Sequence, residues 1–424
     1  MADPKVRDGT VSNRKITFFV ALALFAQEST WNFYDNQVPV LLREHVSSAA
    51  IVGLLMGADN LLGIFVQPWI GNRSDNTRTR WGRRMPYIAV GMPLAALVFL
   101  LLPWASSLAT LVAVMFLYAL VANSTRPLAE SLVPDFIRPE RRSRANAAVK
   151  IATSLTIIVA SLISLLVVDE HPRGAFAIPA VIMLLATAVL IAKVRDSRSP
   201  AYQAAVAEDA TAGHAEARVP FRQVLTELVR DPDRRRLLLL LTVVLFGGAW
   251  FASRSLVTPY GMQALGLTRG EAGGLTLPSG VAFLLACYPA ALAAERFGRL
   301  RTMAVGMTVF AVALAIGTVA QTATGTVVVF CVAAAGAAAF SINAVVALWN
   351  LAPSSRVLGT YTGLYAVTWY LGGFGGPALI GAVVDLTGWT GMLLDIAVLA
   401  ALGVLVIVRL ERLQRRHAAE PVTT

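Results

Sequence analysis

Six ionisable side chains lie inside long apolar segments of this sequence, where a charge is costly. They are Glu28, Asp35, Asp59, Arg126, Glu130 and Arg254. A charge at the centre of a bilayer costs roughly 2.5–3.5 kcal/mol on insertion scales. We therefore expect these groups to face a water-filled cavity or one another. A carboxylate that alternates between burial and an arginine neighbour can take up and release a proton, so the pattern indicates proton coupling.

The first apolar segment carries four polar side chains on one face. Glu28, Asn32, Asp35 and Asn36 fall at positions i, i+4, i+7 and i+8, which share one side of an α-helix. This face is predicted to line an aqueous cavity. We expect Asn32 and Asn36 to bind substrate there, and Glu28 and Asp35 to take part in cation coupling.

Two further segments supply partners for that face. Asp59 and Asn60 lie near the middle of the second apolar segment, and Asn123 precedes Arg126 by one helical turn in the fourth. Acidic groups opposite Arg126 predict an ion pair across the first half of the chain. Asp59 is the first candidate for the proton carrier and Glu28 the second, with Arg126 as their counter-charge; Asn60 and Asn123 are candidate substrate ligands. The alternative is a set of static ion pairs that only stabilises the helices.

The second half of the chain has fewer charges in its apolar segments and more aromatic residues. Trp250 and Arg254 are one helical turn apart, as are Tyr365 and Trp369, and Asn343 lies in the segment before the latter pair. Rings beside amide and guanidinium groups suit the apolar faces and the hydroxyls of a sugar. The alternative is helix packing or an aromatic belt at the membrane surface.

These segments are predicted to be membrane spans in an all-α protein. Of the 424 residues, 56% are hydrophobic and 14% are charged, against about 25% charged in soluble domains. A helix needs about 20 apolar residues to cross roughly 30 Å of hydrocarbon, and twelve such runs are present. They are 16–40, 49–70, 86–104, 108–133, 146–168, 174–194, 237–260, 272–294, 302–321, 325–351, 358–385 and 388–409.

The position of the positive charges predicts the orientation of the chain. The formal net charge is +11, and with a cytoplasmic N-terminus the outside loops hold only Arg43, Arg173 and Arg269. This is the positive-inside pattern of a multi-pass protein in the cell (inner) membrane, with both termini cytoplasmic. The basic residues are expected to contact anionic lipid of the bilayer, and no nucleic-acid partner is expected.

The chain is expected to form two pseudo-symmetric six-helix bundles. Trp31 and Pro39 recur in the second half, at nearly constant separation, as Trp250 and Pro259. The first part of the polar connection between the halves is expected to be a mobile linker, and its second part has the apolar periodicity of an amphipathic helix. The predicted units are the tail 1–15, the bundle 16–194, the linker 195–236 with its helix 220–231, the bundle 237–410 and the tail 411–424.

Helix-breaking residues mark two of the spans. The span at 358–385 contains Gly372, Gly373, Gly375, Gly376 and Pro377, so we expect it to be locally deformable, to pack closely against its neighbours and to serve as a gate helix. In the span at 272–294, Pro278, Ser279 and Gly280 are expected to break the helix in a similar way.

The loop GNRSDNTRTRWGRR at 71–84 places five arginines and an aspartate between two spans, where Asp75 can pair with a guanidinium or face a helix N-terminus. It resembles the G-x-x-x-D-R-x-G-R-R element of the major facilitator superfamily, in the stretched form of the sucrose/proton symporter-like carriers and the glycoside-pentoside-hexuronide symporters. The segments 31–39 and 134–147 are similar to the same carriers, whereas Met85 departs from their pattern. The residues that fit are Gly71, Ser74, Asp75, Arg80, Gly82, Arg83 and Arg84.

The resemblance implies a secondary transporter that works by alternating access, and not an enzyme. It implies a disaccharide or glycoside as substrate, moved by proton symport, and the 71–84 loop as a cytoplasmic gate that latches the halves together in one state. The alternative for this loop is that it only determines the topology. Sodium is the alternative coupling ion, with oxygen ligands from Asp59, Asn60, Asn123 and Glu28. No bound cofactor or metal is expected, and the protein is expected to be a monomer.

Two other functions share this pattern. A proton-coupled exporter of amphipathic drugs or lipids can have the same fold, because fold does not fix substrate. The polar face of the first span favours a hydroxyl-rich solute, whereas the tryptophans favour an apolar one. A solute-sensing receptor on a transport fold is expected to need a large appended soluble domain.

Overall fold

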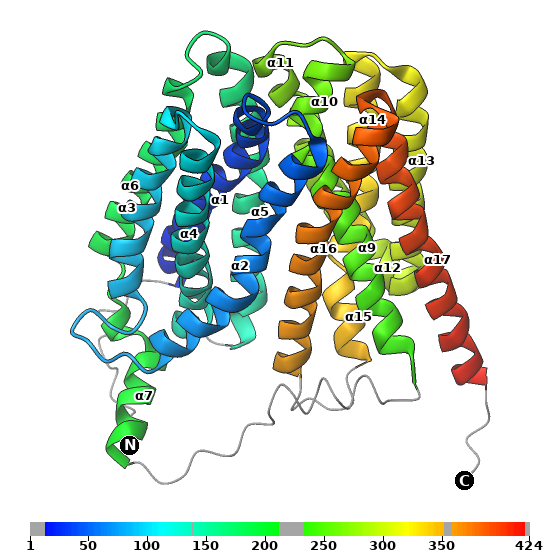
Figure 1. The fold of residues 1–424 in the computed structure, drawn as a ribbon. Coiled ribbons are helices and arrows are strands. Elements are labelled where there is room, and N and C mark those ends of the chain that lie inside the picture. Colours follow the sequence, from blue (N-terminus) through cyan, green and yellow to red (C-terminus); the bar gives the residue numbers. More distant parts are fainter. Residues whose placement is uncertain (1–12, 138, 212–232, 352–357, 420–424) are drawn as a thin grey trace.

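The computed structural model describes residues 13–137, 139–211, 233–351 and 358–419, and its regular elements there are all helical. Figure 1 shows two helical bundles side by side. The first contains α1 (Asn13–Arg43), α2 (Ala49–Asp75), α3 (Met85–Leu101), α4 (Leu108–Phe136), α5 (Pro139–Ile163) and α6 (Ala177–Lys193). The second contains α9 (Arg235–Ser255), α10 (Val257–Ala264), α11 (Arg269–Gly274), α12 (Leu277–Phe297), α13 (Arg299–Ala320), α14 (Ala323–Ser341), α15 (Ala344–Asn350), α16 (Leu358–Thr387) and α17 (Met392–Ala419).

The predicted all-α membrane architecture is confirmed. Eleven helical segments among the described residues are long and apolar enough to cross a membrane. The helix α1 has 31 residues, also enough for a span, but it carries the polar face described above. With α1 as the twelfth, the described part of the chain forms two bundles of six spans each.

The spans alternate in direction, which gives the molecule two ends. The loop 76–84 lies at one end with the last described residues of α17, and we call this the basic end (Figure 1). Residues 44–48, 169–173 and 265–268 lie at the other end, which we call the opposite end.

Short hydroxyl residues begin several helices at the opposite end. The Ser48 side chain accepts a hydrogen bond from the Ile51 amide at the start of α2. Thr268 forms a capping box with Glu271 at the start of α11. Such caps satisfy backbone donors that a helix leaves unpaired, and replacing one by alanine costs about 1 kcal/mol.

Three predicted spans are each divided into two helices. The span at 237–260 breaks at Leu256, because Pro259 lacks an N–H and its ring clashes with the carbonyl four residues earlier. The span at 272–294 breaks before Leu277, earlier than expected, since Pro278 lies in the first turn of α12, where a proline is tolerated. The span at 325–351 breaks at Ile342–Asn343, a break that its sequence does not signal.

The glycine-rich span is one unbroken helix in this structure. Its small residues allow the close packing that was expected, with backbone contact to both bundles. A Cβ on Gly53 of α2 would lie 2.0 Å from the Pro377 carbonyl oxygen, and one on Gly376 would lie 2.2 Å from the Gly248 carbonyl oxygen. The helix α16 therefore packs directly on α2 and α9.

Part of the expected linker is also helical. The helix α7 (Pro200–Thr211) follows the first bundle. Its Tyr202 hydroxyl donates to the Thr79 carbonyl at 2.9 Å. Thr79 belongs to the segment 71–84, which we call the basic loop. The amphipathic helix predicted at 220–231 lies outside the described residues. At the ends of the chain, α1 already begins at Asn13, and α17 continues into the expected tail as far as Ala419.

Candidate functional site

Three of the four residues of the polar face predicted for the first span keep part of their surface exposed. Glu28, Asn32 and Asp35 are partly exposed in α1, whereas most of their neighbours are buried. This helix packs against α4, α5 and α6 of its own bundle and against α9 and α10 of the other bundle. Its partly exposed face therefore lies near the meeting of the two halves.

The ion pair expected across the first bundle is present. The Arg126 Nη2 atom lies 2.9 Å from Glu28 Oε1, which joins α4 to α1. The Nε atom of Arg126 also lies 3.5 Å from Glu130 Oε1, one turn further along α4. Arg126 thus balances one carboxylate in the polar face and a second one closer to the basic end.

Asn32 and Arg254 join the two halves directly. The Arg254 Nη2 atom donates to Asn32 Oδ1 at 3.1 Å, and Asn32 Nδ2 donates to the Thr156 hydroxyl of α5 at 2.8 Å. The Arg254 guanidinium also lies 5.9 Å from the centre of the Trp250 ring. Arg254 is buried, so this contact places a positive charge between the polar face of α1 and the aromatic residues of α9.

Asp59 has polar neighbours but no ion pair with a described residue. Its Oδ1 atom accepts from the Asn60 backbone amide at 2.8 Å and from Asn60 Nδ2 at 2.9 Å. Asn123 donates to the Asp59 backbone carbonyl at 3.2 Å, and its side-chain oxygen accepts from Gln67 at 2.9 Å. The side-chain oxygens of Asp59 and Asn123 are therefore turned to separate amide donors.

Gln67 extends this set of contacts into the second half. Its amide nitrogen donates to the Tyr370 hydroxyl at 2.8 Å, and that hydroxyl lies 3.0 Å from the Gln67 side-chain oxygen. The sequence showed Gln67 on the same helix as Asp59, but its partner on α16 depends on how the halves dock.

The second bundle contributes a wall of aromatic rings. Trp369 lies nearly parallel to Tyr365 and to Phe340, at 17° and 18°, with ring centres 6.2 and 6.4 Å apart. Trp250 packs near Phe283 at 5.8 Å. Trp250, Tyr365 and Trp369 all keep part of their surface exposed, so these rings pack on one another and still present surface.

Two predicted substrate ligands are buried in contacts between and within helices. Asn36 is buried and donates to the Gly273 carbonyl of α11 at 3.4 Å. Asn343 is buried at the break between α14 and α15 and donates to the Ala339 carbonyl of its own helix at 2.9 Å. Both amides hold helices in place in this structure.

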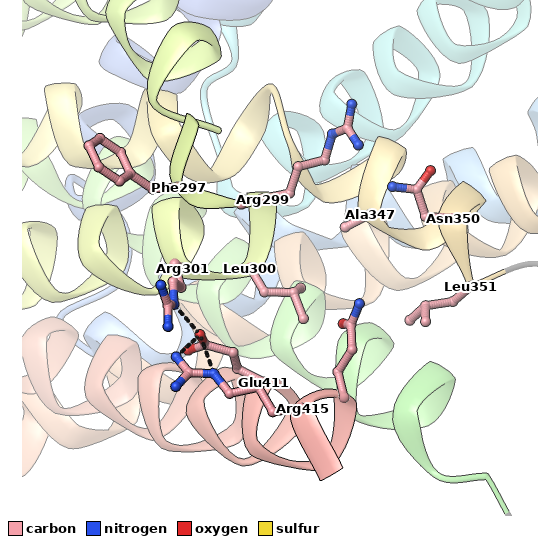
Figure 2. A pocket seen from close by; sticks show the side chains of 11 residues that line it. Phe297, Arg299, Leu300, Arg301, Ala347, Asn350, Leu351, Glu411 and Arg415 are labelled. Carbon is pink, nitrogen blue, oxygen red and sulfur yellow. Dashed lines mark hydrogen bonds and ion pairs between the residues drawn. The ribbon is translucent and has the colours of Figure 1, made fainter. Parts of the chain in front are cut away.

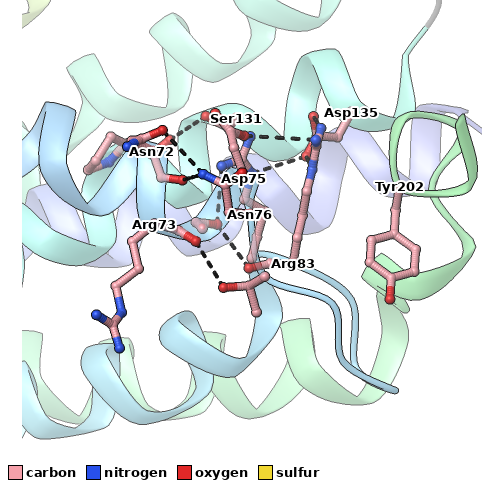
Figure 3. A network of polar contacts seen from close by, with 12 residues as sticks. Asn72, Arg73, Asp75, Asn76, Arg83, Ser131, Asp135 and Tyr202 are labelled. Carbon is pink, nitrogen blue, oxygen red and sulfur yellow. Dashed lines mark hydrogen bonds and ion pairs between the residues drawn. The ribbon is translucent and has the colours of Figure 1, made fainter. Parts of the chain in front are cut away.

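The basic loop forms a network within the first bundle. Figure 3 shows Arg83 reaching Asp135 of α4, with nitrogen–oxygen distances of 2.5 and 3.2 Å. Arg84 lies 2.6 Å from Asp75 Oδ1 and 3.2 Å from Asp135 Oδ2. Partial burial by itself lowers the pKa of Arg83, but the hydrogen bond and charge of Asp135 outweigh it and raise that pKa.

The rest of the loop is fixed by an aspartate that the sequence did not single out. Asp196 accepts from the backbone amides of Arg84 at 2.5 Å and Met85 at 3.3 Å, at the start of α3. Gly82 has a φ of +101°, and a Cβ there would lie 2.4 Å from the Asp196 carboxylate. This position therefore requires glycine.

The other loop positions differ in their contacts. The Ser74 hydroxyl donates to the Arg83 carbonyl at 2.9 Å and accepts from Arg84 at 3.1 Å. Arg80 is exposed, and the space next to Gly71 is open. Among the described residues, neither of these two takes part in the charge network.

At the opposite end, each half supplies a carboxylate to a helix start in the other half. Asp385 of α16 accepts from the Ser48 hydroxyl at 2.6 Å and from the Ala49 and Ala50 amides at 2.7 and 3.1 Å.

The first half likewise supplies a carboxylate to a helix start in the second half. Asp169, which follows α5, accepts from the Thr268 hydroxyl at 2.6 Å and from the Gly270 amide at 2.7 Å. We call these two contacts the reciprocal caps. They tie the halves together at the opposite end.

Comparison with known proteins identifies the family. The family model described as Major Facilitator Superfamily matches residues 18–288 and 262–423. The chain belongs to the major facilitator superfamily. It is therefore a multi-pass membrane protein and a secondary transporter, and not an enzyme.

Solved structures of transporters have the same fold. A bacterial homolog of the human lysosomal transporter Spinster, inward-facing and occupied, has a TM-score of 0.76 at 14% identity, covering 95% of this chain and 98% of that chain. A mutant of the nucleoside transporter NupG has a TM-score of 0.71 at 13% identity, covering 93% and 99%. A POT family transporter in complex with a thioalcohol-conjugated peptide has a TM-score of 0.73 at 13% identity, covering 94% and 96%.

One curated relative is similar over a shorter stretch. The human protein named membrane-associated transporter protein is 34% identical over 95 residues, which are 22% of this chain and 18% of that protein. The match thus spans less than a fifth of that relative's length.

Proposed function

We propose that this transporter moves a small polar solute, a disaccharide or glycoside, by proton symport through alternating access. The observation that carries the proposal is the contact between Asn32 and Arg254 at the meeting of the two halves. On one side of it lies the ion pair of Glu28 with Arg126. On the other side lie Trp250 and the aromatic wall. A solute that replaces this contact meets hydrogen-bonding groups and ring faces together.

The residue types favour a saccharide. Asn32 offers an amide, and Arg254 offers several N–H donors, both suited to hydroxyl groups. Trp369 and Tyr365 present flat apolar surface for the C–H face of a sugar ring. Binding sites for small molecules combine apolar rings with a few placed polar groups in this way. The solved neighbours named for a nucleoside transporter and for a bound peptide conjugate are consistent with a polar solute on this fold.

The contacts of Asp59 favour a proton over sodium as the coupling ion. A sodium site built from Asp59, Asn123 and Glu28 needs their oxygens turned to one point. Here the Asn123 oxygen accepts from Gln67 and Glu28 pairs with Arg126. A proton needs only a carboxylate that can be neutralised, and Asp59 has no guanidinium or ammonium partner among the described residues that would keep it ionised.

Export of amphipathic drugs or lipids is the second candidate. The observation that favours it is the run of rings in the second bundle, where Trp250 packs against Phe283 and Phe310. An apolar solute gains from such a surface without using Asn32 or Arg254. The two candidate functions therefore differ in whether Asn32 and Arg254 take part in binding the solute.

The basic loop is proposed to act as a conformational latch. In this structure its arginines bind carboxylates of their own half, while the reciprocal caps close the opposite end. This is the arrangement expected for a transporter open towards the basic end. In the other state, the loop would bind the second half, and the caps would be broken.

Ligand binding by the wild-type protein tests the proposal. Thermal-shift measurements across a panel of disaccharides, glycosides and lipophilic cations, each at two pH values, compare the two candidates directly. We expect a saccharide to raise the melting temperature, and uptake into proteoliposomes to follow an imposed pH gradient without sodium. Stabilisation by lipophilic cations alone would favour the exporter. A requirement for sodium would overturn the proton assignment and leave the substrate assignment standing.

A further inference from the structure

A hollow lies away from the meeting of the halves, at the basic end of the second bundle. It is a cavity of about 430 Å³ between the start of α13, the end of α15 and the last turns of α17. Figure 2 shows Arg301 and Arg415 converging on Glu411 at one side of it, while Arg299 and Asn350 lie across from them. Neither the proposed substrate site nor the basic loop at 71–84 includes any of these residues.

The lining carries more positive than negative charge. Three arginines and one glutamate line the cavity. Glu411 Oε1 accepts from Arg301 Nε at 2.8 Å, from Arg415 Nε at 3.2 Å and also from Arg415 Nη2. One carboxylate therefore positions two guanidinium groups and leaves their other N–H donors available. Arg299 is exposed and has no acidic partner within the described ranges. A fork of N–H donors of this kind matches the geometry of a phosphate.

The start of α13 adds backbone donors to the same cavity. Its N-cap is Gly298, which has no side chain to bond the first amides. Gly298 and the next three residues all line the cavity, and the space next to Gly298 is open. The helix has 22 residues, and the positive end of its dipole adds to the attraction for an anion.

Apolar surface continues from the cavity along the sides of the helices. Phe297, Leu300 and Leu351 line it beside the arginines. Val305 and Val312 on α13 are exposed, and so is Leu405 on the adjacent α17. In a membrane such side chains face the hydrocarbon. The charged cavity thus opens next to a surface that acyl chains cover.

We propose that this cavity binds a phosphate ester anion. Arg299 and Arg301 bind its oxygens together with the amides at the start of α13, and Arg415 binds it from α17. The phosphate belongs either to the head group of an anionic phospholipid or to a soluble phosphate compound. The neighbouring apolar surface favours the phospholipid, because the same molecule then satisfies the arginines and covers exposed valine and leucine side chains.

Native mass spectrometry of the full-length protein in a neutral detergent tests the site. The probes are dioctanoyl phosphatidylglycerol, glycerol phosphate, and dioctanoylglycerol as a lipid without phosphate. The variants are Arg299→Gln alone and Arg299→Gln with Arg301→Gln. The matched controls are Arg296→Gln and Arg412→Gln, since both arginines are exposed at the same end, adjoin lining residues in the sequence and do not line the cavity.

We expect the wild type to bind phosphatidylglycerol and not dioctanoylglycerol. Loss of each lining arginine should weaken the binding about tenfold, the usual worth of a hydrogen bond to a charged group, and the controls should stay within about twofold. Binding of glycerol phosphate as tight as that of the lipid would assign the site to a soluble phosphate. Equal losses in the control variants, or no phosphate-dependent binding at all, would overturn the proposal. Because Arg299 has no acidic partner to lose among the residues that the structure describes, the single variant tests the site even if the double variant folds poorly.

Discussion

The two halves of this transporter are alike at the opposite end and different in the middle. At the opposite end, Ser48 and Thr268 each begin a helix and each donate to an aspartate from the other half. In the middle, the first half carries the ion pair of Glu28 and Arg126 as well as Asp59. The second half carries stacked rings and one buried arginine there.

This difference indicates how the work of transport is divided. The contacts that form and break as the two halves move are alike in both halves, because each half moves against the other around the same site. Side chains that act on different partners have diverged. The carboxylates of the first half suit a proton, and the rings of the second half suit the body of a solute. Changes in one half are therefore expected to separate coupling from binding.

The largest expected effect is on coupling, through the first half. Asp59→Asn should abolish accumulation against a gradient and retain exchange of preloaded substrate, because an amide permanently resembles the neutral carboxyl group. Counterflow and pH-driven uptake in proteoliposomes measure the two activities. Glu130→Gln is the matched control, since Glu130 is an exposed second partner of Arg126. Full pH-driven accumulation by Asp59→Asn would remove Asp59 from the mechanism and make Glu28 the candidate.

The next effect separates the two walls of the substrate site. Asn32→Leu should weaken saccharide binding by about 5- to 150-fold, because it leaves sugar hydroxyls and Arg254 without a partner at a cost of about 1–3 kcal/mol. Trp369→Ala should weaken it about 2- to 10-fold through the loss of a ring contact. Isothermal titration of both variants with a disaccharide and a lipophilic cation gives the affinities.

The tryptophan control for that experiment lies far from the site. Trp104 stacks with Arg173 at the opposite end, so Trp104→Ala should leave both affinities unchanged. If Asn32→Leu binds the lipophilic cation more tightly and the wild type shows no heat of saccharide binding, the site would be assigned to an amphipathic solute.

The third effect tests the likeness of the two halves at the opposite end. Asp169→Asn and Asp385→Asn should each open that end by about 2- to 30-fold in population, since loss of a cap costs about 0.5–2 kcal/mol. Distances between spin labels at His45→Cys and Leu386→Cys, with Cys287 and Cys331 replaced by serine, report the opening.

A carboxylate that stays within one half provides the control for the caps. Asp395 accepts from Thr387 in the same half, so Asp395→Asn should not change the label distances. Equal shifts for Asp169→Asn and Asp385→Asn are expected from the matched geometry. A shift from one variant alone would show that the two caps are alike in geometry and not in energy.

The sequence predicted the parts of this structure that follow from local spacing. Charges in apolar helices must find partners, so helical periodicity predicted an ion pair of Arg126 with an acidic group of the first two spans, and the structure identifies that group as Glu28. Asp75 was expected to pair with an arginine of its loop or to face a helix N-terminus, and its partner at 2.6 Å is Arg84. The twelve spans followed from length and hydropathy in the same way.

The remaining contacts depend on how the halves dock. Gln67 meets Tyr370, and Asp385 meets Ser48, only because α2 and α16 pack backbone to backbone. No local periodicity encodes such pairs. The duplication did hold a signal, since Asp169 and Asp385 recur at nearly the separation of Ser48 and Thr268. Other contacts have no such signal, including the break at Asn343.

The smallest effect on affinity is expected at the basic end. Asp75→Asn combined with Arg83→Ala should slow transport severalfold and keep substrate affinity within about tenfold, because a latch shifts the populations of two states without touching the solute. Transport rates and titration measure the two quantities, and Arg80→Ala is the control, since Arg80 is exposed outside the network. The Arg83 pair with Asp135 also supports the first bundle, so the melting temperature must be measured in parallel. If the variants lose stability but exchange between states at the wild-type rate, the loop only braces its own half. The reciprocal caps would then be the remaining candidates for controlling the exchange.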